Sequence, residues 1–379
     1  MSKPNFATLK LFITGPTYIR DEIKEAALLP EFGHRDAEND LRFRPIRENL
    51  RKLAGCGDDY EPILCLGSGS TAMEASVRSL VADGETILNV SVGAFGDLYY
   101  NLAAHNGKKA ENLRFDYGRA IDLNVLEDKL KELRPDVVSF THNETSTGVV
   151  NDIKAVCALI RRYNAMPLVD GVSIFGGAEL DLSNSGAAMY STATQKALAL
   201  PAGFGIGFVS GEAEEKAATV TGKGHHHDIT KHLGRARKNQ TLTTPNCTLA
   251  NQMWRQLDYI VNEEGVQNRF DRHSAMRSMV EEWVGGLPGF EMFAPEGYRS
   301  PTVSTVLCPE GVTVSQLKKG VKEALRGEGY LMDPGYGKLN AALEEAGRRL
   351  VFRVGHMGDI TPAMLGEYLG KLEAELNKL

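Results

Sequence analysis

The feature that most constrains the fold is a regular alternation between short apolar runs and amphipathic stretches, which begins near residue 60. The apolar runs have the length of buried strands, and the stretches between them carry apolar residues at helical spacing. Strand and helix repeated in this order predict a parallel sheet with helices on both faces. Ligands of such sheets bind outside the carboxyl ends of the strands, so we look for chemistry in the residues that follow them. The predicted strands are 63–66, 86–92, 137–140 and 167–169, and the predicted helices are 71–81, 95–105 and 153–163.

The pattern changes after Leu249 and predicts a second, smaller α+β domain. We expect a large domain over residues 16–252 and a small C-terminal domain over residues 253–379. Residues 1–15 are expected to pack beside the small domain, because the apolar run 11–13 is too short and too apolar to be left free. The small domain is expected to contain a helical stretch at 250–264 that leads into 273–285, strands at 302–307 and 350–354, and helices at 314–326 and 362–379.

The charge balance and the apolar pattern exclude several classes of protein. The 379 residues include 43 Lys and Arg against 49 Asp and Glu, and this net charge of −6 argues against nucleic-acid binding and docking on an anionic membrane. No apolar run approaches the roughly 20 residues that span a bilayer, and the N-terminus lacks the apolar core of a signal peptide. The cysteines are scattered, odd in number and never spaced as CxxC, which is typical of reduced thiols in a cytoplasmic protein. They are Cys56, Cys65, Cys157, Cys247 and Cys308.

The segment Gly67-Ser68-Gly69-Ser70-Thr71 follows a predicted strand and opens a predicted helix. Unpaired backbone N–H groups and the helix dipole favour an anion at such a position, and phosphate is the natural ligand. A tight turn with a serine N-cap is the alternative, which the segment alone leaves open. The segment is not GxGxxG, and no Walker lysine follows it, so dinucleotide and nucleotide sites are disfavoured.

Two further residues follow predicted strands and could act with this segment. Asp170 comes directly after the strand 167–169, and Lys196 stands 26 residues later in an apolar setting, followed by Ala-Leu-Ala-Leu-Pro-Ala-Gly. Burial lowers the pKa of a lysine and makes its neutral amine a nucleophile, as Schiff-base chemistry requires. Each residue alone has an ordinary alternative, a turn cap or a surface lysine. A phosphate cup, a carboxylate and a lysine at strand ends are together the parts of a pyridoxal phosphate site.

These residues lie in motifs that resemble the class V aminotransferases of the fold type I pyridoxal phosphate enzymes, in the alanine–glyoxylate and serine–pyruvate branch. The matching motifs lie at 67–75, 141–149, 168–173 and 195–203, within a resemblance that runs from Gly15-Pro16 to 353–358. The resemblance implies an α/β fold, with a mainly parallel seven-stranded sheet covered by helices in the large domain and a smaller α+β C-terminal domain. It further implies a pyridoxal 5'-phosphate-dependent aminotransferase. Its ping-pong mechanism would move the amino group of alanine or serine to glyoxylate or pyruvate.

The resemblance also implies roles for individual residues. Lys196 would carry the cofactor as a Schiff base and move the proton during the reaction, and Asp170 would pair with the pyridinium nitrogen. Arg353 would hold the substrate α-carboxylate through a two-point contact, with the backbone of Gly15 close to the substrate. For Phe95, stacking on the cofactor ring is implied, and plain core packing stays open. The other implied cofactor contacts are phosphate contacts of Ser68, Gly69, Ser70 and Gln195 and a ring-edge contact of Thr145.

Thr243 matches the position at which the family reaches the phosphate of the neighbouring subunit. The resemblance therefore implies a homodimer with shared active sites. Relatives often have a tyrosine three residues before this threonine, and this chain has Gln240 there. A second phosphate contact from the partner subunit is therefore in doubt.

Several alternatives stay open from the sequence. Phosphoserine or 2-aminoethylphosphonate could be the donor, because the segment 221–237 is rich in Lys, Arg and His and could form a basic loop at the cleft. A cysteine desulfurase would need a reactive cysteine on a late flexible loop, and Cys308 instead ends a predicted strand. A non-catalytic binding subunit would not need Lys196 or Asp170. His225, His226 and His227 are consecutive and cannot all face one ion, so no metal site is expected there.

Overall fold

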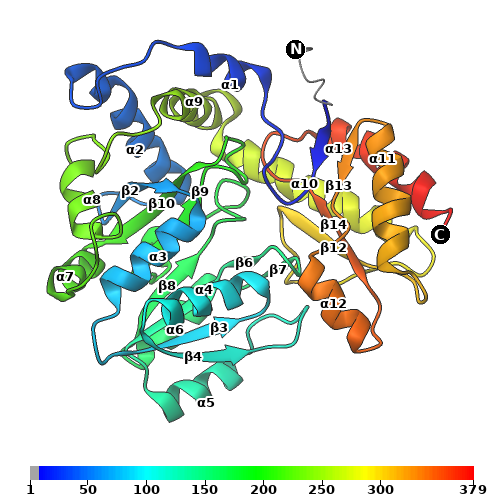
Figure 1. Cartoon of the computed structure of the whole chain (residues 1–379), viewed down its shortest axis with the longest axis horizontal. Coiled ribbons are helices and arrows are strands. Elements are labelled where there is room, and N and C mark those ends of the chain that lie inside the picture. The colour runs from blue at the N-terminus through cyan, green and yellow to red at the C-terminus, as the bar shows by residue number, and fades with distance from the viewer. Residues whose placement is uncertain (1–7) are drawn as a thin grey trace, which may run out of the picture.

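The computed structural model describes residues 8–379. Its centre is a seven-stranded sheet in the order β2-β10-β9-β8-β5-β3-β4 (Figure 1). The four pairs from β9 to β4 are parallel, and β10 runs antiparallel to both of its neighbours. The predicted α/β fold with a mainly parallel sheet is therefore confirmed. The strands are β2 (Tyr60–Gly67), β3 (Thr86–Ser91), β4 (Lys109–Arg114), β5 (Val137–Thr141), β8 (Met166–Asp170), β9 (Met189–Ala193) and β10 (Gly203–Ser210).

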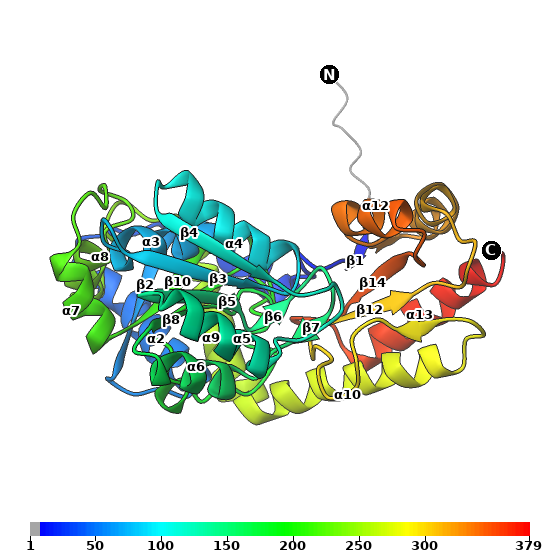
Figure 2. The ribbon, with the colours of Figure 1, turned by 90° about the horizontal axis from the view of Figure 1, so that it is seen from below.

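Helices cover both faces of this sheet, and each face has its own apolar core (Figure 2). One face is covered by α2 (Asp40–Ala54), α5 (Leu123–Leu133), α6 (Ile153–Arg162) and α9 (Cys247–Asp258). The other is covered by α3 (Gly69–Leu80), α4 (Ala94–His105), α7 (Gly211–Thr219) and α8 (Ile229–Ala236). The predicted helices 71–81, 95–105 and 153–163 correspond to α3, α4 and α6. No helix within residues 8–379 is long and apolar enough to cross a membrane.

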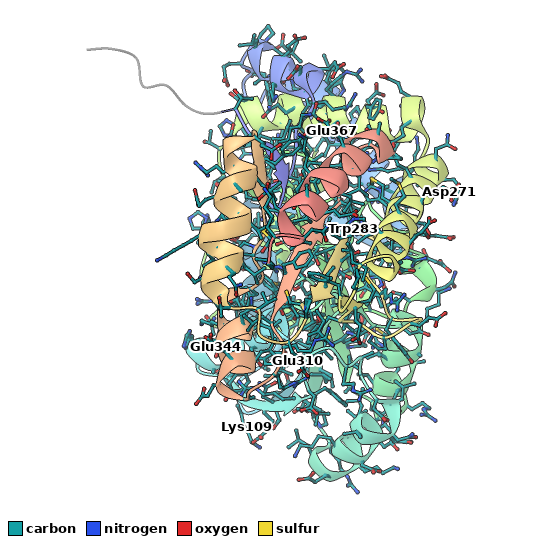
Figure 3. All side chains as sticks on the ribbon, turned by 90° about the vertical axis from the view of Figure 1, so that its right-hand side faces the viewer. Lys109, Asp271, Trp283, Glu310, Glu344 and Glu367 are labelled. Carbon is teal, nitrogen blue, oxygen red and sulfur yellow. The ribbon has the colours of Figure 1, made fainter. Side chains whose placement is uncertain are left out.

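The rest of the chain forms a smaller part around a three-stranded antiparallel sheet, β11-β12-β14. Figure 3 looks onto its helical side, with Trp283 labelled on α10 and Glu367 on α13. Trp283 Nε1 donates to Glu373 Oε2 at 3.0 Å and so ties α10 to α13. The elements are β11 (Glu291–Met292), β12 (Val303–Leu307), β13 (Tyr330–Met332), β14 (Val351–Gly355), α10 (Val266–Gly285), α11 (Glu323–Gly327), α12 (Gly337–Glu345) and α13 (Pro362–Leu376).

The start of the chain belongs to this smaller part by its contacts. Strand β1 (Lys10–Phe12) pairs in parallel with β13, and the Phe12 ring stacks on Tyr368 with 4.0 Å between the ring centroids. Residues 1–7, which were expected to pack there too, lie outside the described residues. The chain then crosses to the larger part through the short helix α1 (Asp21–Glu25) (Figure 1).

The two parts meet along α10, which runs from one to the other (Figure 2). Phe270 on this helix belongs to the core of the larger part, whereas Met276 belongs to the core of the smaller part. The predicted division between residues 252 and 253 falls inside α9, and Met253 and Leu257 pack in the larger core. The domain division stays a prediction, while the change of core lies within α10. A hairpin of β6 (Asn143–Glu144) and β7 (Val149–Val150) also bridges the parts, since Val150 N donates to Tyr298 O at 2.9 Å.

Candidate active site

Lys196 lies in a turn after β9, between the two parts of the molecule. Its Nζ donates to the backbone oxygen of Thr14 and stands 6.0 Å from the centre of the Phe95 ring. Gly15 has φ of +117°, which strains any other residue, and a Cβ atom there would lie 2.7 Å from Nζ and displace the amine. Burial, followed by the charge of Arg353, lowers the pKa of Lys196 to about 8. The amine is thereby closer to the neutral, nucleophilic form than an exposed lysine is.

The backbone of this turn is held by three side chains from distant parts of the sequence. Thr17 Oγ1 donates to Lys196 O at 3.1 Å, Arg269 Nη2 to Ala197 O at 2.6 Å and Gln256 Nε2 to Leu198 O at 3.0 Å. Arg269 is fully buried and forms ion pairs with Glu264 at 2.7 Å and Asp359 at 3.0 Å. These interactions fix the position from which the lysine side chain extends. Sequence reasoning did not identify Arg269, because nothing local marks it as different from its neighbours on α10.

Asp170 is the last residue of β8 and is buried, with 3% of its surface exposed. It accepts a hydrogen bond from Val172 N at 2.8 Å. Burial, above all, raises its pKa to about 7, and the charge of Glu144 acts in the same direction. Its neighbours across the sheet are Thr141 and Ser191, whose buried hydroxyls have no partner among the described residues. A cationic group beside Asp170 would therefore relieve an unfavourable burial.

The segment Gly67–Thr71 spans the end of β2 and the first turn of α3. Ser68 is the N-cap of α3 and forms a capping box with Thr71, so the serine N-cap that the sequence left open is present. Gly67 has φ of +135°, and a Cβ atom there would meet Thr71 Oγ1 at 2.2 Å, so the turn requires glycine. Ser68 N donates to Thr71 Oγ1 at 3.3 Å, and the Ser68 and Ser70 hydroxyls lie 2.9 Å apart. The side-chain oxygen of Gln195 is buried without a partner among residues 8–379. The turn thus presents a helix N-terminus and hydroxyl groups of the kind that bind an anion.

Phe95 is positioned by a buried carboxylate. Glu144 Oε2 accepts hydrogen bonds from the backbone N–H groups of Phe95 and Gly96, both at 3.0 Å, and its other oxygen binds Ser146. A negative charge at the start of α4 is favoured by the helix dipole. Glu144 is completely buried, and this burial raises its pKa. The sequence placed Glu144 in a family motif without a role, and the structure shows what it holds.

Arg353 on β14 enters the site from the smaller part. Its Nη1 donates to the backbone oxygen of Thr145 at 2.9 Å, and its Nη2 forms an ion pair with Asp333 at 2.9 Å. The guanidinium carbon lies 5.8 Å from the centre of the Tyr336 ring. The rings of Tyr336 and Phe95 have centroids 6.1 Å apart and line a cavity of about 320 Å³, which Lys196, Asp170 and Arg353 do not line. Asp333 directly follows β13, so the strand-end rule that drew attention to Asp170 could also have found it.

Thr243 lies away from Lys196, on a cavity of about 250 Å³ that also reaches Thr71. His226, His227 and His232 line the same cavity. The part of the chain that the structure describes contains no group of three or more His, Cys, Asp or Glu placed to hold a metal ion.

The expectation of a basic loop over 221–237 is corrected in part, because residues 229–236 form α8, with Leu233 buried in the core beside β2. Within this segment Lys223 is paired with Asp228 at 3.0 Å, and Arg237 with Glu214. Cys308 is buried, and burial raises the pKa of its thiol to about 12.

The residues present fit pyridoxal phosphate. The buried Asp170 calls for a cationic partner such as a protonated ring nitrogen, and Gly15 leaves the Lys196 amine free of side-chain crowding. Gln195 directly precedes Lys196. The turn at Gly67 presents a helix N-terminus, which suits the phosphate group. The other contacts to the cofactor stay predictions, namely those of Ser68, Gly69, Ser70, Thr145 and Thr243.

Comparisons with known proteins agree with this arrangement. The family model described as Aminotransferase class-V matches residues 24–326. An uncharacterized aminotransferase of Methanocaldococcus jannaschii is 30% identical over 356 residues, covering 92% of this chain and 87% of that protein. A serine–glyoxylate aminotransferase of Hyphomicrobium methylovorum is 29% identical, covering 97% and 90%. The crystal structure of alanine–glyoxylate aminotransferase from Nostoc sp. has the same fold, with a TM-score of 0.88 at 24% identity over 99% of this chain and 97% of that one.

The match to the family model spans most of the chain, and the M. jannaschii relative matches nearly its whole length. The chain therefore belongs to the class-V aminotransferase family and is a pyridoxal-phosphate-dependent aminotransferase of fold type I.

Proposed function

We propose that the enzyme moves the amino group of alanine or serine to glyoxylate or pyruvate, with Lys196 as its catalytic residue. The observation that carries this proposal is the convergence of three charges. Lys196 Nζ donates to the backbone oxygen of Thr14, whose hydroxyl donates to Asp333, the ion-pair partner of Arg353. The charges of Arg353 and Asp170 also act on the pKa of Lys196, in opposite directions. An amine, a buried carboxylate and a guanidinium are what transamination of an α-amino acid requires. The printed activities of the serine–glyoxylate and alanine–glyoxylate relatives support the choice of substrates.

The division of labour follows from the contacts of each side chain. Bound pyridoxal phosphate supplies a ring that withdraws electrons and so acidifies the Cα–H bond of the amino acid. Lys196, whose pKa of about 8 lies near neutrality, would take the proton from Cα of the bound amino acid and carry it to the cofactor. Asp170 would hold the ring nitrogen in its protonated form. Arg353 orients the α-carboxylate, and Glu144 holds the backbone of Phe95 so that its ring forms one wall of the site.

The charge of the segment 221–237 bears on the choice of donor. The cations of the segment 221–237 that could have favoured a phosphorylated donor are partly neutralised by Asp228 and Glu214. Phosphoserine and 2-aminoethylphosphonate are therefore the less favoured donors.

We also propose a homodimer in which Thr243 reaches the phosphate site of the partner subunit. Large apolar side chains are exposed on the larger part, namely Leu28, Leu41 and Leu66, with 85%, 68% and 39% of their surface accessible. Leu66 directly precedes the phosphate turn and lines the same cavity as Thr243. The expected cytoplasmic location is supported by the five free cysteines.

The proposed function is tested by single turnover. The cofactor-loaded enzyme is mixed with a panel of amino donors, and absorbance follows conversion of the cofactor to its amine form. Alanine or serine should convert it fastest, and glyoxylate or pyruvate should restore the original spectrum. A wide preference for phosphoserine or 2-aminoethylphosphonate would overturn the substrate assignment and leave the aminotransferase assignment intact.

A further inference from the structure

The guanidinium proposed to hold the substrate carboxylate already has an anionic partner. Arg353 Nη2 lies 2.9 Å from Asp333 Oδ2, and both side chains are 8% exposed. Nη1 is occupied by Thr145 O at 2.9 Å. Within the described residues, only Nε of the three guanidinium nitrogens has no partner. An incoming carboxylate therefore meets a guanidinium that is partly engaged.

Asp333 is itself fixed in place. Its Oδ1 accepts a hydrogen bond from Gly335 N at 3.0 Å, and its Oδ2 accepts one from Thr14 Oγ1 at 3.2 Å. The backbone N–H of Arg353 donates to Asp333 O at 3.0 Å, so the backbones of the two residues are joined as well. Gly335, with φ of +92°, packs against the backbone oxygen of Val351, where a Cβ atom would lie at 2.2 Å. The carboxylate is thus part of a rigid turn, and displacing it would break several interactions.

This arrangement sets the charge of the pocket. The pair of Arg353 and Asp333 is neutral as a unit, and the buried Nε is the guanidinium nitrogen left without a partner among the described residues, so it is the donor that a bound anion would satisfy. A carboxylate with a single negative charge gains the Nε contact and meets limited repulsion from Asp333. A dianion, such as a phosphonate or phosphate group, carries a second charge that Asp333 repels at short range. Asp333 also favours the charged form of Lys196 and thereby opposes the effect of Arg353 on it.

We propose that Asp333 is a specificity-determining residue: it directs the substrate carboxylate to the Nε edge of Arg353 and excludes dianionic head groups from this position. The inference rests on the proposed function, in which Arg353 binds the α-carboxylate. It gives a reason, based on charge, why the site selects carboxylic acids over phosphonates. It also assigns a task to Asp333, which pairs with Nη2 of Arg353, whereas Thr145 binds Nη1.

The test compares two small anions that share a methyl group, acetate and methylphosphonate. Their dissociation constants are measured by calorimetry and by the absorbance of the bound cofactor, for wild type, Asp333→Asn, Asp333→Glu and Arg353→Ala. In Asp333→Asn, methylphosphonate should bind about tenfold more tightly or better, while the constant for acetate changes by less than about threefold. Asp333→Glu keeps the charge and should restore the discrimination. In steady-state assays of Asp333→Asn, the KM of the donor should change more than kcat.

A second measurement uses only the wild type, in case Asp333→Asn fails to fold. Relative to acetate, methylphosphonate should bind more tightly below its second ionisation, where it is a monoanion, than above it. Equal changes for both anions in Asp333→Asn, or no preference for the monoanion in the wild type, would overturn the inference. Arg353→Ala separates the two proposals: if it leaves acetate binding unchanged, the carboxylate site of the proposed function fails, whatever Asp333 does.

Discussion

The two ends of the candidate site are built in different ways. The lysine end comprises Lys196, Asp170 and the turn 196–199, whose backbone oxygens are held by Thr17, Arg269 and Gln256. The phosphate end comprises Gly67–Thr71, Gln195 and Thr243, where hydroxyls bond to each other, one amide oxygen has no partner in the described chain, and Leu66 is exposed.

The difference shows which part of the site one chain completes by itself. The lysine end is held by interactions within a single chain and should keep its geometry without the cofactor. The phosphate end contains hydroxyl groups and a helix N-terminus that can bind an anion. We propose that the partner subunit completes this end. The predictions below test this contrast, from the largest expected effect to the smallest.

Replacing Arg269 with methionine should destabilise the protein most. The change removes one of the two cations paired with each of the carboxylates of Asp359 and Glu264, which keep Arg20 and Arg272, and it leaves the oxygen of Ala197 without its donor. Because each carboxylate keeps one cation, we expect a loss of about 3 kcal/mol, the lower end for a broken buried ion pair, to be measured by urea unfolding of the cofactor-free protein. Arg237→Met, which breaks the exposed pair with Glu214, is the matched control and should cost at most about 1 kcal/mol. Equal losses for both variants would show that the lysine end is not specially held.

Asp170 should make the cofactor-free protein lose stability as pH rises from about 4 to 7. Its pKa is raised from 3.8 to about 7 by burial, so the folded state binds more protons than the unfolded state in this window. Below the unfolded pKa the carboxyl group is protonated in both states, and the protein keeps its full stability. As pH rises through the folded pKa the buried group ionises, and the free energy of unfolding falls by a few kcal/mol in total. The difference between wild type and Asp170→Asn isolates this effect. A difference that does not vary with pH would contradict the assigned burial of the charge.

The paired substitution of Ser68 and Ser70 by alanine should act on both ligand binding and folding. Removing two hydroxyls from an anion site should weaken the binding of cofactor by roughly tenfold. Fluorescence titration of the cofactor-free protein measures this. The free energy of unfolding without cofactor should fall by about 1 kcal/mol, because Ser68 is the N-cap of α3. Thr17→Val, at the lysine end, should cost a similar amount of stability, about 1 kcal/mol, and should leave the affinity for the cofactor within about threefold of the wild type.

The smallest signal is expected from subunit exchange. Lys196→Ala and a variant disrupted at Thr243 are both inactive or weak, but a hybrid dimer has one site with both lesions and one with neither. Random exchange should therefore restore about a quarter of the wild-type activity if Thr243 serves the partner subunit. If Thr243 serves its own subunit, each hybrid site carries one lesion, and activity should not rise on mixing.

The sequence predicted the architecture wherever local pattern decides it. The helices α3, α4 and α6 and the strand that ends at Asp170 follow from apolar spacing. Strand β10 was missed because its sequence, GFGIGFVS, alternates with glycine and carries a weak strand signal. The glycines have a tertiary cause: a Cβ atom at Gly205 would lie 2.3 Å from Ser68 O, so the phosphate turn packs directly on this strand.

The residues of the candidate site also fall into two groups, those that the sequence identifies and those whose roles depend on the folded chain. Lys196, Asp170 and Arg353 stand at strand ends or in recognisable motifs, and their types suggest their chemistry. Arg269 could not be predicted, because its partners Glu264 and Asp359 and the oxygen of Ala197 come together only in the folded chain. The segment 221–237 was misjudged for a related reason, since the paired states of Lys223 and Arg237 depend on tertiary contacts.

The central claim is that Lys196 is the residue that binds the cofactor covalently. Borohydride reduction of the loaded enzyme followed by peptide mapping tests it most directly. The reduced cofactor should be found on the peptide containing Lys196. Lys196→Ala should bind the cofactor without becoming labelled. Stable labelling of any other lysine in the wild type would contradict the assignment of the site.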